Sequence, residues 1–154
     1  MPSPDTPGVI APPPLIFAVA LGLGWLLDRA VPQPALPGAV VPWAGGGLIL
    51  AAVAIAAAAV WEMRRARTAV DPYSPSTALV CTGPFARSRN PIYLALTLLS
   101  LGIALLINAL WCVLLVLPAF VVLRRFVVAR EEAYLQRRFG DAYRRYCAAT
   151  PRWW

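Results

Sequence analysis

A run of 21 residues from Trp43 to Met63 carries a single charge, at Glu62 close to its end. As a helix rising 1.5 Å per residue, this run reaches about 31 Å, which matches the hydrocarbon thickness of a bilayer. Further apolar runs cover residues 15–31, 92–107 and 110–128. We therefore predict an all-α integral membrane protein with about four transmembrane helices, built as a single domain over residues 1–154.

The composition argues against a soluble fold. Apolar residues make up 60% of the 154 residues and charged residues only 14%, whereas ordinary soluble domains carry about 25% charged residues. A soluble helical bundle of this length could not bury so much apolar surface, and its helices would not need runs so long and so free of charge. Lipid is therefore the expected solvent for much of the chain.

The types of polar residue exclude several chemistries. All fourteen basic residues are arginine, and the chain has no histidine. A lysine Schiff base, a histidine general base and a zinc site built on imidazole are therefore excluded. The three cysteines, Cys81, Cys112 and Cys147, show no Cys-x-x-Cys spacing, so we expect neither a disulfide framework nor a metal site.

The arginines are distributed asymmetrically. All except Arg29 lie within residues 64–89 and 124–152, beside apolar runs. Because positive charge marks the cytoplasmic side of membrane proteins, we expect the connection between the second and third helices and both termini in the cytoplasm. This pattern suits the inner membrane of a bacterial-type cell, and it explains the net charge of +7 without a nucleic-acid partner.

The last two apolar runs predict a tight helical hairpin, since only a short link at Asn108 separates them. Two polar segments, residues 81–93 and 130–132, flank this hairpin and are therefore expected on the same side of the membrane. Pro118 is expected to kink the fourth helix. Residues 129–139 and 141–147 predict cytoplasmic C-terminal helices separated by a glycine cap at Gly140.

The first polar segment has the features of an anion site. Pro91 fits the first position of a helix and Asn90 its N-cap, so free N–H groups and the positive end of the helix dipole face the cytoplasm. Arg87 and Arg89 strengthen the attraction for a carboxylate, and either one can orient an anionic acceptor. The alternative reading is a plain capped helix start with arginine at the lipid head groups.

The second polar segment contains the only adjacent carboxylates of the chain, Glu131 and Glu132. Carboxylates at this position are suited to hold the ammonium group of a ligand; the alternative is a solvated helix face. An anion site opposite a cation site suits a zwitterion such as the amino-acid part of S-adenosylmethionine. Tyr143 and Tyr146 share a helix face and can line a pocket, whereas Trp153 and Trp154 suit an interfacial aromatic belt.

Four sequence elements carry a family resemblance. They are Thr82-Gly83-Pro84-Phe85; Ser88-Arg89-Asn90-Pro91-Ile92-Tyr93; Leu101-Gly102; and Glu131-Glu132 followed by Leu135, Phe139-Gly140, Tyr143 and Tyr146. In this order and spacing the chain resembles the superfamily of isoprenylcysteine carboxyl methyltransferases and phospholipid methyltransferases. The likeness covers about residues 68–151.

The resemblance implies an integral membrane methyltransferase that uses S-adenosylmethionine and a lipophilic acceptor (a membrane lipid or small molecule with a carboxylate, amine or thiol) at the cytoplasmic face. The cofactor region then covers about residues 82–93 and 129–147. The cofactor-binding residues are expected to be Arg89, Asn90, Pro91, Tyr93, Gly102, Glu131, Glu132, Tyr143 and Tyr146. Arg87 and Arg89 are the catalytic candidates.

Two questions stay open from the sequence. One is which of the two adjacent carboxylates, Glu131 or Glu132, meets the cofactor, because neighbouring helix positions point about 100° apart. The other is the class of protein: a membrane reductase that uses a nicotinamide cofactor is one alternative, since some sterol-type reductases resemble the C-terminal half of this superfamily. A non-catalytic membrane scaffold is the other.

Overall fold

The computed structural model describes residues 8, 11–34, 36, 38, 40–71 and 73–153. Its helices are α1 (Pro13–Ala30), α2 (Val40–Arg65), α3 (Pro91–Leu106), α4 (Leu110–Leu123), α5 (Ala129–Phe139) and α6 (Asp141–Ala149). A short 3₁₀-helix, η1 (Gly83–Ala86), lies in the connection between α2 and α3, and a π-helical segment, η2 (Arg124–Val128), joins α4 to α5. The described part of the chain contains no strand, which confirms the all-α prediction.

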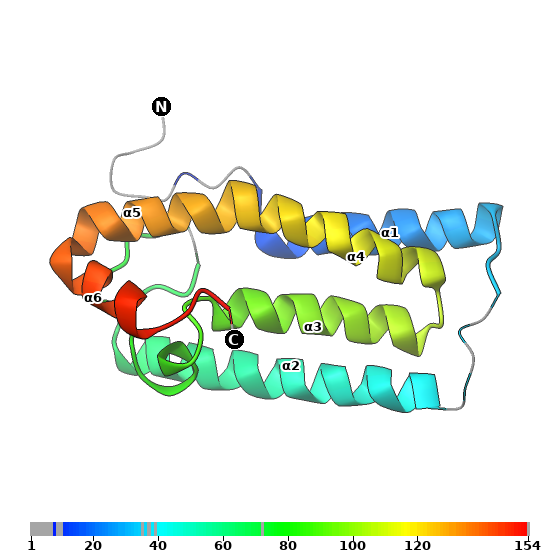
Figure 1. Ribbon diagram of the computed structural model, residues 1–154, viewed down its shortest axis with the longest axis horizontal. Helices are drawn as coiled ribbons and strands as arrows, with labels where there is room; N and C mark the ends of the chain where they lie inside the picture. Colours follow the sequence, from blue (N-terminus) through cyan, green and yellow to red (C-terminus); the bar gives the residue numbers. More distant parts are fainter. Residues whose placement is uncertain are drawn as a thin grey trace.

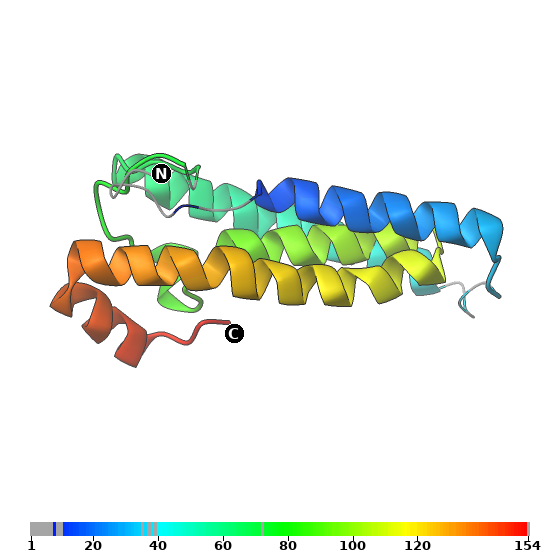
Figure 2. The ribbon, with the colours of Figure 1, turned by 90° about the horizontal axis from the view of Figure 1, so that it is seen from above.

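Four helices run side by side along the long axis of the molecule (Figure 1). α2 packs on α3, and α1 packs on α4. The α3–α4 turn lies at one end of the bundle, near the link between α1 and α2, and is called here the turn end. The α2–α3 connection, α5 and α6 gather at the opposite end, called here the polar end (Figures 1 and 2).

Three helices are long and apolar enough to cross a membrane: α1 with 18 residues, α2 with 26, and the continuous α4–α5 helix with 30. The remaining apolar helix, α3, has 16 residues and reaches about 24 Å at 1.5 Å per residue. Large apolar side chains on the outside, such as Trp43 and Leu50, are consistent with a lipid environment. The architecture fits an integral membrane protein, and the bounds of α1, α2 and α3 agree closely with the predicted runs.

Glycines bring two helix pairs into close contact. A Cβ atom on Gly45 of α2 would lie 2.8 Å from the carbonyl oxygen of Gly102 on α3, and a Cβ on Gly102 would lie 2.8 Å from the Gly45 oxygen. Gly24 of α1 approaches the backbone of Cys112 on α4 in the same way. Of the three consecutive glycines that start at Gly45, only the first makes such a contact; Gly46 and Gly47 have open space.

The fourth helix is longer than predicted and contains a π-helical segment that the sequence does not predict. Pro118 lies inside α4 without ending it. The α-helical pattern changes to π-helical at Arg124 and returns at Ala129, so α4 and α5 form one continuous helix (Figure 2). A π-helical turn inserts an extra residue into the helix and is frequent at functional sites. The side chains of α5, including the paired carboxylates, therefore take a direction that a regular α-helix would not give them.

The turn end is held by polar side chains. Asn108 adopts a positive φ of 52°, which asparagine tolerates better than most residues. Its Oδ1 atom accepts a hydrogen bond from the backbone N–H of Leu36 at 2.9 Å. Trp111 donates from Nε1 to the carbonyl of Val31 at 3.0 Å. The predicted tight hairpin is confirmed, and its turn is tied to the link between α1 and α2.

Candidate functional site

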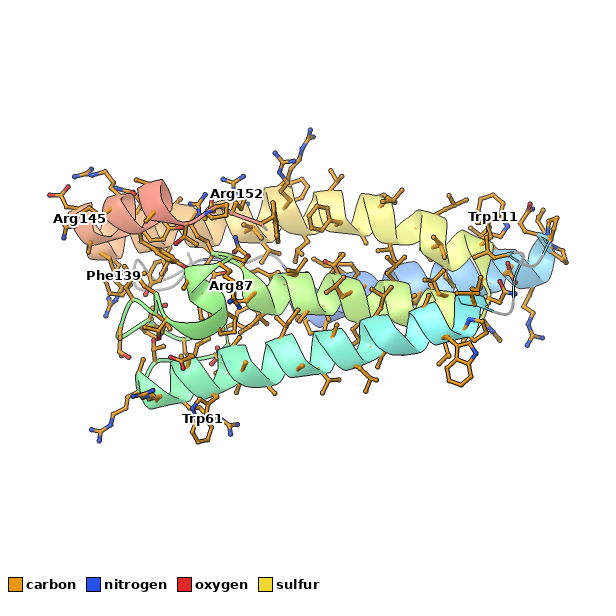
Figure 3. The ribbon with its side chains drawn as sticks, turned by 60° about the horizontal axis from the view of Figure 1, so that its bottom comes forward. Trp61, Arg87, Trp111, Phe139, Arg145 and Arg152 are labelled. Atoms are coloured by element: carbon orange, nitrogen blue, oxygen red, sulfur yellow. The ribbon has the colours of Figure 1, made fainter. Side chains whose placement is uncertain are left out.

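The two polar segments meet at the polar end. The hydroxyl of Tyr93 donates a 2.6 Å hydrogen bond to Oε2 of Glu131, and Nη1 of Arg89 lies 3.3 Å from Oε1 of Glu132. The α3–α4 hairpin therefore brings residues 81–93 and 130–132 together, as the sequence predicts. Figure 3 shows Arg87 and Arg152 at this end of the molecule and Trp111 at the opposite end.

Two arginines hold Glu132. Besides its ion pair with Arg89, the carboxylate accepts a hydrogen bond from Nε of Arg152 at 3.0 Å and pairs through its other oxygen with Nη2 of Arg152. Only 13% of the Glu132 side chain is exposed. A bidentate contact of this kind fixes both partners in one geometry. The negative charge of Glu132 is thus already balanced within the protein.

Arg89 makes further contacts besides its ion pair with Glu132. Its Nη1 atom also contacts Sγ of Cys147 at 2.7 Å, and 16% of its side chain is exposed. Burial is the largest single influence and disfavours its charge, but Glu132, Cys147 and Tyr143 together outweigh burial and raise the pKa of Arg89. Its Nε atom is buried and has no hydrogen-bond partner among the described residues. Arg89 is therefore a permanent cation with one donor unused.

Glu131 has different surroundings from its neighbour. Its contact is the Tyr93 hydroxyl, and no cation lies within ion-pair distance of it among the described residues. A carboxylate that is partly withdrawn from water without a cation is unfavourable unless a ligand or proton offsets the lost hydration. Glu131, unlike Glu132, also lines a cavity of about 500 Å³, so it is the carboxylate of the pair that faces this cavity.

A cavity of about 500 Å³ lies between the start of α1, α2, α3 and the α2–α3 connection. Along α2 and α3 its wall is apolar and includes Ala52, Ala56, Ala95, Leu96 and Leu99. Its polar part consists of Asp71, Arg89, Asn90, Tyr93 and Glu131. The volume falls in the range of small-molecule sites, and the lining suits a ligand with one apolar and one polar part.

The C-terminal segment closes one side of the site. The side chain of Asn90 donates from Nδ2 to the carbonyl of Arg152 at 3.2 Å, and the hydroxyl of Ser88 donates to the same carbonyl at 3.2 Å. The backbone N–H of Arg89 donates to the carbonyl of Pro151 at 3.0 Å. Asn90 is thus the N-cap of α3 by position, but its side chain makes no capping hydrogen bond.

Tyr143 and Tyr146 are buried on one face of α6, with ring centroids 6.2 Å apart. The Tyr146 hydroxyl donates to the carbonyl of Phe85 in η1 at 2.7 Å. Burial raises the pKa of both phenols, so both are protonated at neutral pH. Neither lines the cavity. Tyr146 therefore supports the first polar segment through η1, and Tyr143 lies close to Arg89.

The remaining predicted residues are spread over the fold. Pro91 lines the cavity at the first turn of α3. Arg87 is exposed and lies at the polar end (Figure 3). Gly102 lies at the α2–α3 crossing beside Gly45 rather than in the cavity wall. Trp153 packs against Phe120, with centroids 4.9 Å apart, while the predicted position of Trp154 lies outside the described residues.

Sequence reasoning missed three contributors to the site: Ser88, Arg152 and Cys147. Only the first belongs to a motif, and no spacing rule connects residues 88 and 152. From the sequence alone, Arg152 is only one of the many arginines expected on the cytoplasmic side. A signal was nevertheless present, because Arg152 follows the last predicted helix and precedes an aromatic residue that anchors the tail.

Comparison with known proteins finds one family and one relative. The model of a family described as phospholipid methyltransferase matches residues 40–142, which include both polar segments. An uncharacterised protein of Haemophilus influenzae is 40% identical over 62 residues, which cover 40% of this chain and 98% of that protein. No solved structure matches the chain.

Proposed function

The chain belongs to the phospholipid methyltransferase family, and on this basis we propose that it transfers a methyl group from S-adenosylmethionine to a lipophilic acceptor with a carboxylate, amine or thiol. The observation that carries the proposal is the 500 Å³ cavity. Its apolar wall along α2 and α3 suits the acceptor, and its polar part is formed by the two segments that the hairpin joins. The reaction would then take place where the polar part meets the apolar wall.

The residues of the polar part fit the amino-acid portion of S-adenosylmethionine. A zwitterion needs a carboxylate for its ammonium group, and Glu131 lines the cavity without a cation beside it among the described residues. It also needs donors for its carboxylate. Arg89 has an unused buried Nε atom, and the start of α3 is not capped by the Asn90 side chain, so its first N–H groups favour an anion.

When bound, this cofactor supplies a methyl group already activated on sulfonium, so the protein needs no covalent nucleophile. The chain has to hold the acceptor in line and keep water away, and positioning of this kind contributes about 7–11 kcal/mol. Arg89 and Glu131 would orient the polar groups, with Tyr93 fixing the rotamer of Glu131 through its hydroxyl. Arg87, exposed at the same end, would orient an anionic head group.

We further propose that the polar end faces the cytoplasm of a bacterial-type cell. Nine exposed arginines lie at the end of α2, in the α2–α3 connection and on α5 and α6: Arg64, Arg65, Arg67, Arg87, Arg130, Arg137, Arg138, Arg144 and Arg145. Arg124 and Arg125 are exposed in η2, which leads into α5. At the turn end Arg29 lies over the ring of Trp25. This asymmetry supports the cytoplasmic orientation, in which a water-soluble cofactor reaches the site directly and the acceptor arrives from the lipid.

The test is calorimetry on the purified protein in lipid nanodiscs. We expect binding of S-adenosylhomocysteine in the absence of metal and no binding of NADPH. Incubation with methyl-labelled S-adenosylmethionine and a lipid extract should then label a lipid product. Binding of NADPH alone would support the reductase, and binding of neither compound would support the scaffold.

A further inference from the structure

The C-terminal segment from Thr150 to Trp153 is docked on the site by three kinds of contact. Its backbone carbonyls at Pro151 and Arg152 accept hydrogen bonds from residues 88–90. The Arg152 guanidinium engages both oxygens of Glu132. Trp153 packs against Phe120 with the two rings tilted by 54° and contacts the core cluster around Phe17. Thr150 is itself buried. The segment therefore has a defined place in the fold.

This segment lies beyond residues 40–142, which match the family model. The match covers Arg89 and Glu132 but not the second arginine that holds the carboxylate. Without Arg152, Glu132 would keep one cation, Arg89, within ion-pair distance. With it, Glu132 has two cations, whereas Glu131 has none among the described residues. Arg152 thus increases the electrostatic difference between the two adjacent carboxylates.

We propose that Arg152 is a positioning residue of the cofactor site: by clamping Glu132 it fixes Arg89 and leaves Glu131 to receive the positive group of the ligand. This inference rests on the proposed function, because the ligand is the zwitterionic part of S-adenosylmethionine. The clamp acts through two links. Oε1 of Glu132 lies 3.3 Å from Nη1 of Arg89. The Arg152 carbonyl accepts a hydrogen bond from Asn90, the residue directly before α3.

The geometry explains why an arginine is required. A bidentate fork binds both carboxylate oxygens in one plane, whereas a lysine ammonium is a point charge on a flexible stem. The Arg152 side chain is 35% exposed and that of Arg89 only 16%, so Arg152 is the more water-accessible of the two cations that hold Glu132.

The test is a double-mutant cycle on binding of S-adenosylhomocysteine, measured by calorimetry in nanodiscs. Loss of a charge-assisted contact predicts that R152Q and E132Q each weaken binding by roughly tenfold. Because both changes break the same clamp, the double variant should be no more than about twofold weaker than either single variant. R152Q combined with E131Q should instead show the product of the two effects, since Glu131 contacts the ligand independently. R152K should restore part of the loss.

Two controls separate this role from general stabilisation. R144Q removes an exposed pair with Asp141 on α6, and its affinity should equal that of the unmodified protein. In a Cys81→Ser background, maleimide should label Cys147 faster in R152Q and E132Q than in the parent, because Arg89 no longer covers the thiol. This second readout needs no cofactor, so failure of the proposed function leaves it intact.

Two outcomes would overturn the proposal. One is unchanged affinity for S-adenosylhomocysteine in R152Q when the parent binds it. The other is a fully multiplicative loss in the double variant of Arg152 and Glu132, which would mean that the two residues act independently. If the parent itself does not bind, the proposed function fails, and equal labelling of Cys147 in all variants would show separately that the clamp is absent.

Discussion

The Tyr93 hydroxyl, on the first turn of α3, donates a 2.6 Å hydrogen bond to the Glu131 carboxylate on the first turn of α5. This bond spans the α3–α4 hairpin and joins the two polar segments of the sequence. It also defines the direction of the Glu131 side chain, which lines the cavity. The Tyr93 hydroxyl donates one hydrogen bond to the Glu131 carboxylate but supplies no positive charge. A cationic group of a ligand can therefore pair with Glu131.

Replacement of Glu131 by glutamine should therefore weaken binding of S-adenosylhomocysteine by roughly tenfold to a hundredfold, the range for a lost charge-assisted hydrogen bond. The amide keeps the size of the side chain and can still accept from Tyr93, so the fold should persist. Calorimetry gives the affinity. Asp28→Asn, near the end of α1 that lies at the turn end (Figure 1), is the matched carboxylate control and should bind normally; equal losses in both variants would contradict the assignment.

The apolar part of the cavity should limit the size of the acceptor. Ala52 is 2% exposed and lines the wall together with Ala56 and Ala95, so Ala52→Leu fills space without touching the polar part. We expect a lower rate of methyl transfer to long-chain acceptors from the lipid extract, with an unchanged affinity for S-adenosylhomocysteine. The measurement is label incorporation into lipids separated by chain length.

The control for this change is Ala58→Leu, which adds the same volume on an exposed face of α2. It should leave transfer unchanged for every chain length. A cavity that takes no part in acceptor binding would give the same product distribution in both variants. A loss of cofactor affinity in Ala52→Leu would mean that the apolar part holds the cofactor instead.

The sequence predicts most of the fold because the main signals are local. Apolar runs of membrane length identify the helices. The short link at Asn108 allows the last two runs to form only an antiparallel hairpin, which brings Tyr93 and Glu131 to the same end of the bundle. The π-helical segment at Arg124–Val128 was not predicted. It depends on how α4 packs, and no composition rule indicates where an extra residue enters a helix.

The site is less predictable than the fold because its contacts join distant residues. The motifs indicate Arg89, Asn90 and the paired carboxylates, but the partner of each depends on tertiary packing. Asn90 has the sequence of an N-cap, yet its Nδ2 atom donates to a backbone carbonyl 62 residues away, and its side chain makes no capping hydrogen bond. The pairing of Arg152 with Glu132 is equally non-local. Only packing shows that Glu132 is neutralised and Glu131 is not.

Gly102 illustrates how a motif residue acquires a packing role. Its Cβ position is 2.8 Å from the Gly45 oxygen and from Cγ1 of Ile49, so Gly102→Ala should separate α2 from α3. Overpacking of this kind destabilises by about 1–3 kcal/mol, measured as a lower midpoint of thermal unfolding in detergent. Gly46→Ala is the matched control, since its Cβ has open space and alanine favours a helix by up to about 1 kcal/mol. An unchanged midpoint for Gly102→Ala would contradict the close crossing.

Both polar segments should be accessible from one side of the membrane only. Ala86 in η1 and Ala142 in α6 are exposed at the polar end, and Pro34 is exposed in the link between α1 and α2. In a background without Cys81 and Cys147, single cysteines at these positions report topology through an impermeant maleimide. Because exposed arginines gather at the polar end, residues 86 and 142 should react in inverted vesicles, and residue 34 in right-side-out vesicles.

This labelling separates orientation from fold. If residues 86 and 142 both react from the outside and residue 34 from the inside, the bundle is inverted but the site is intact, and only the cytoplasmic assignment fails. If residues 86 and 142 react from opposite sides, α3 and α4 cannot form a hairpin that returns to the same face. Tyr93 could then not reach Glu131, and the shared site would be excluded together with the orientation.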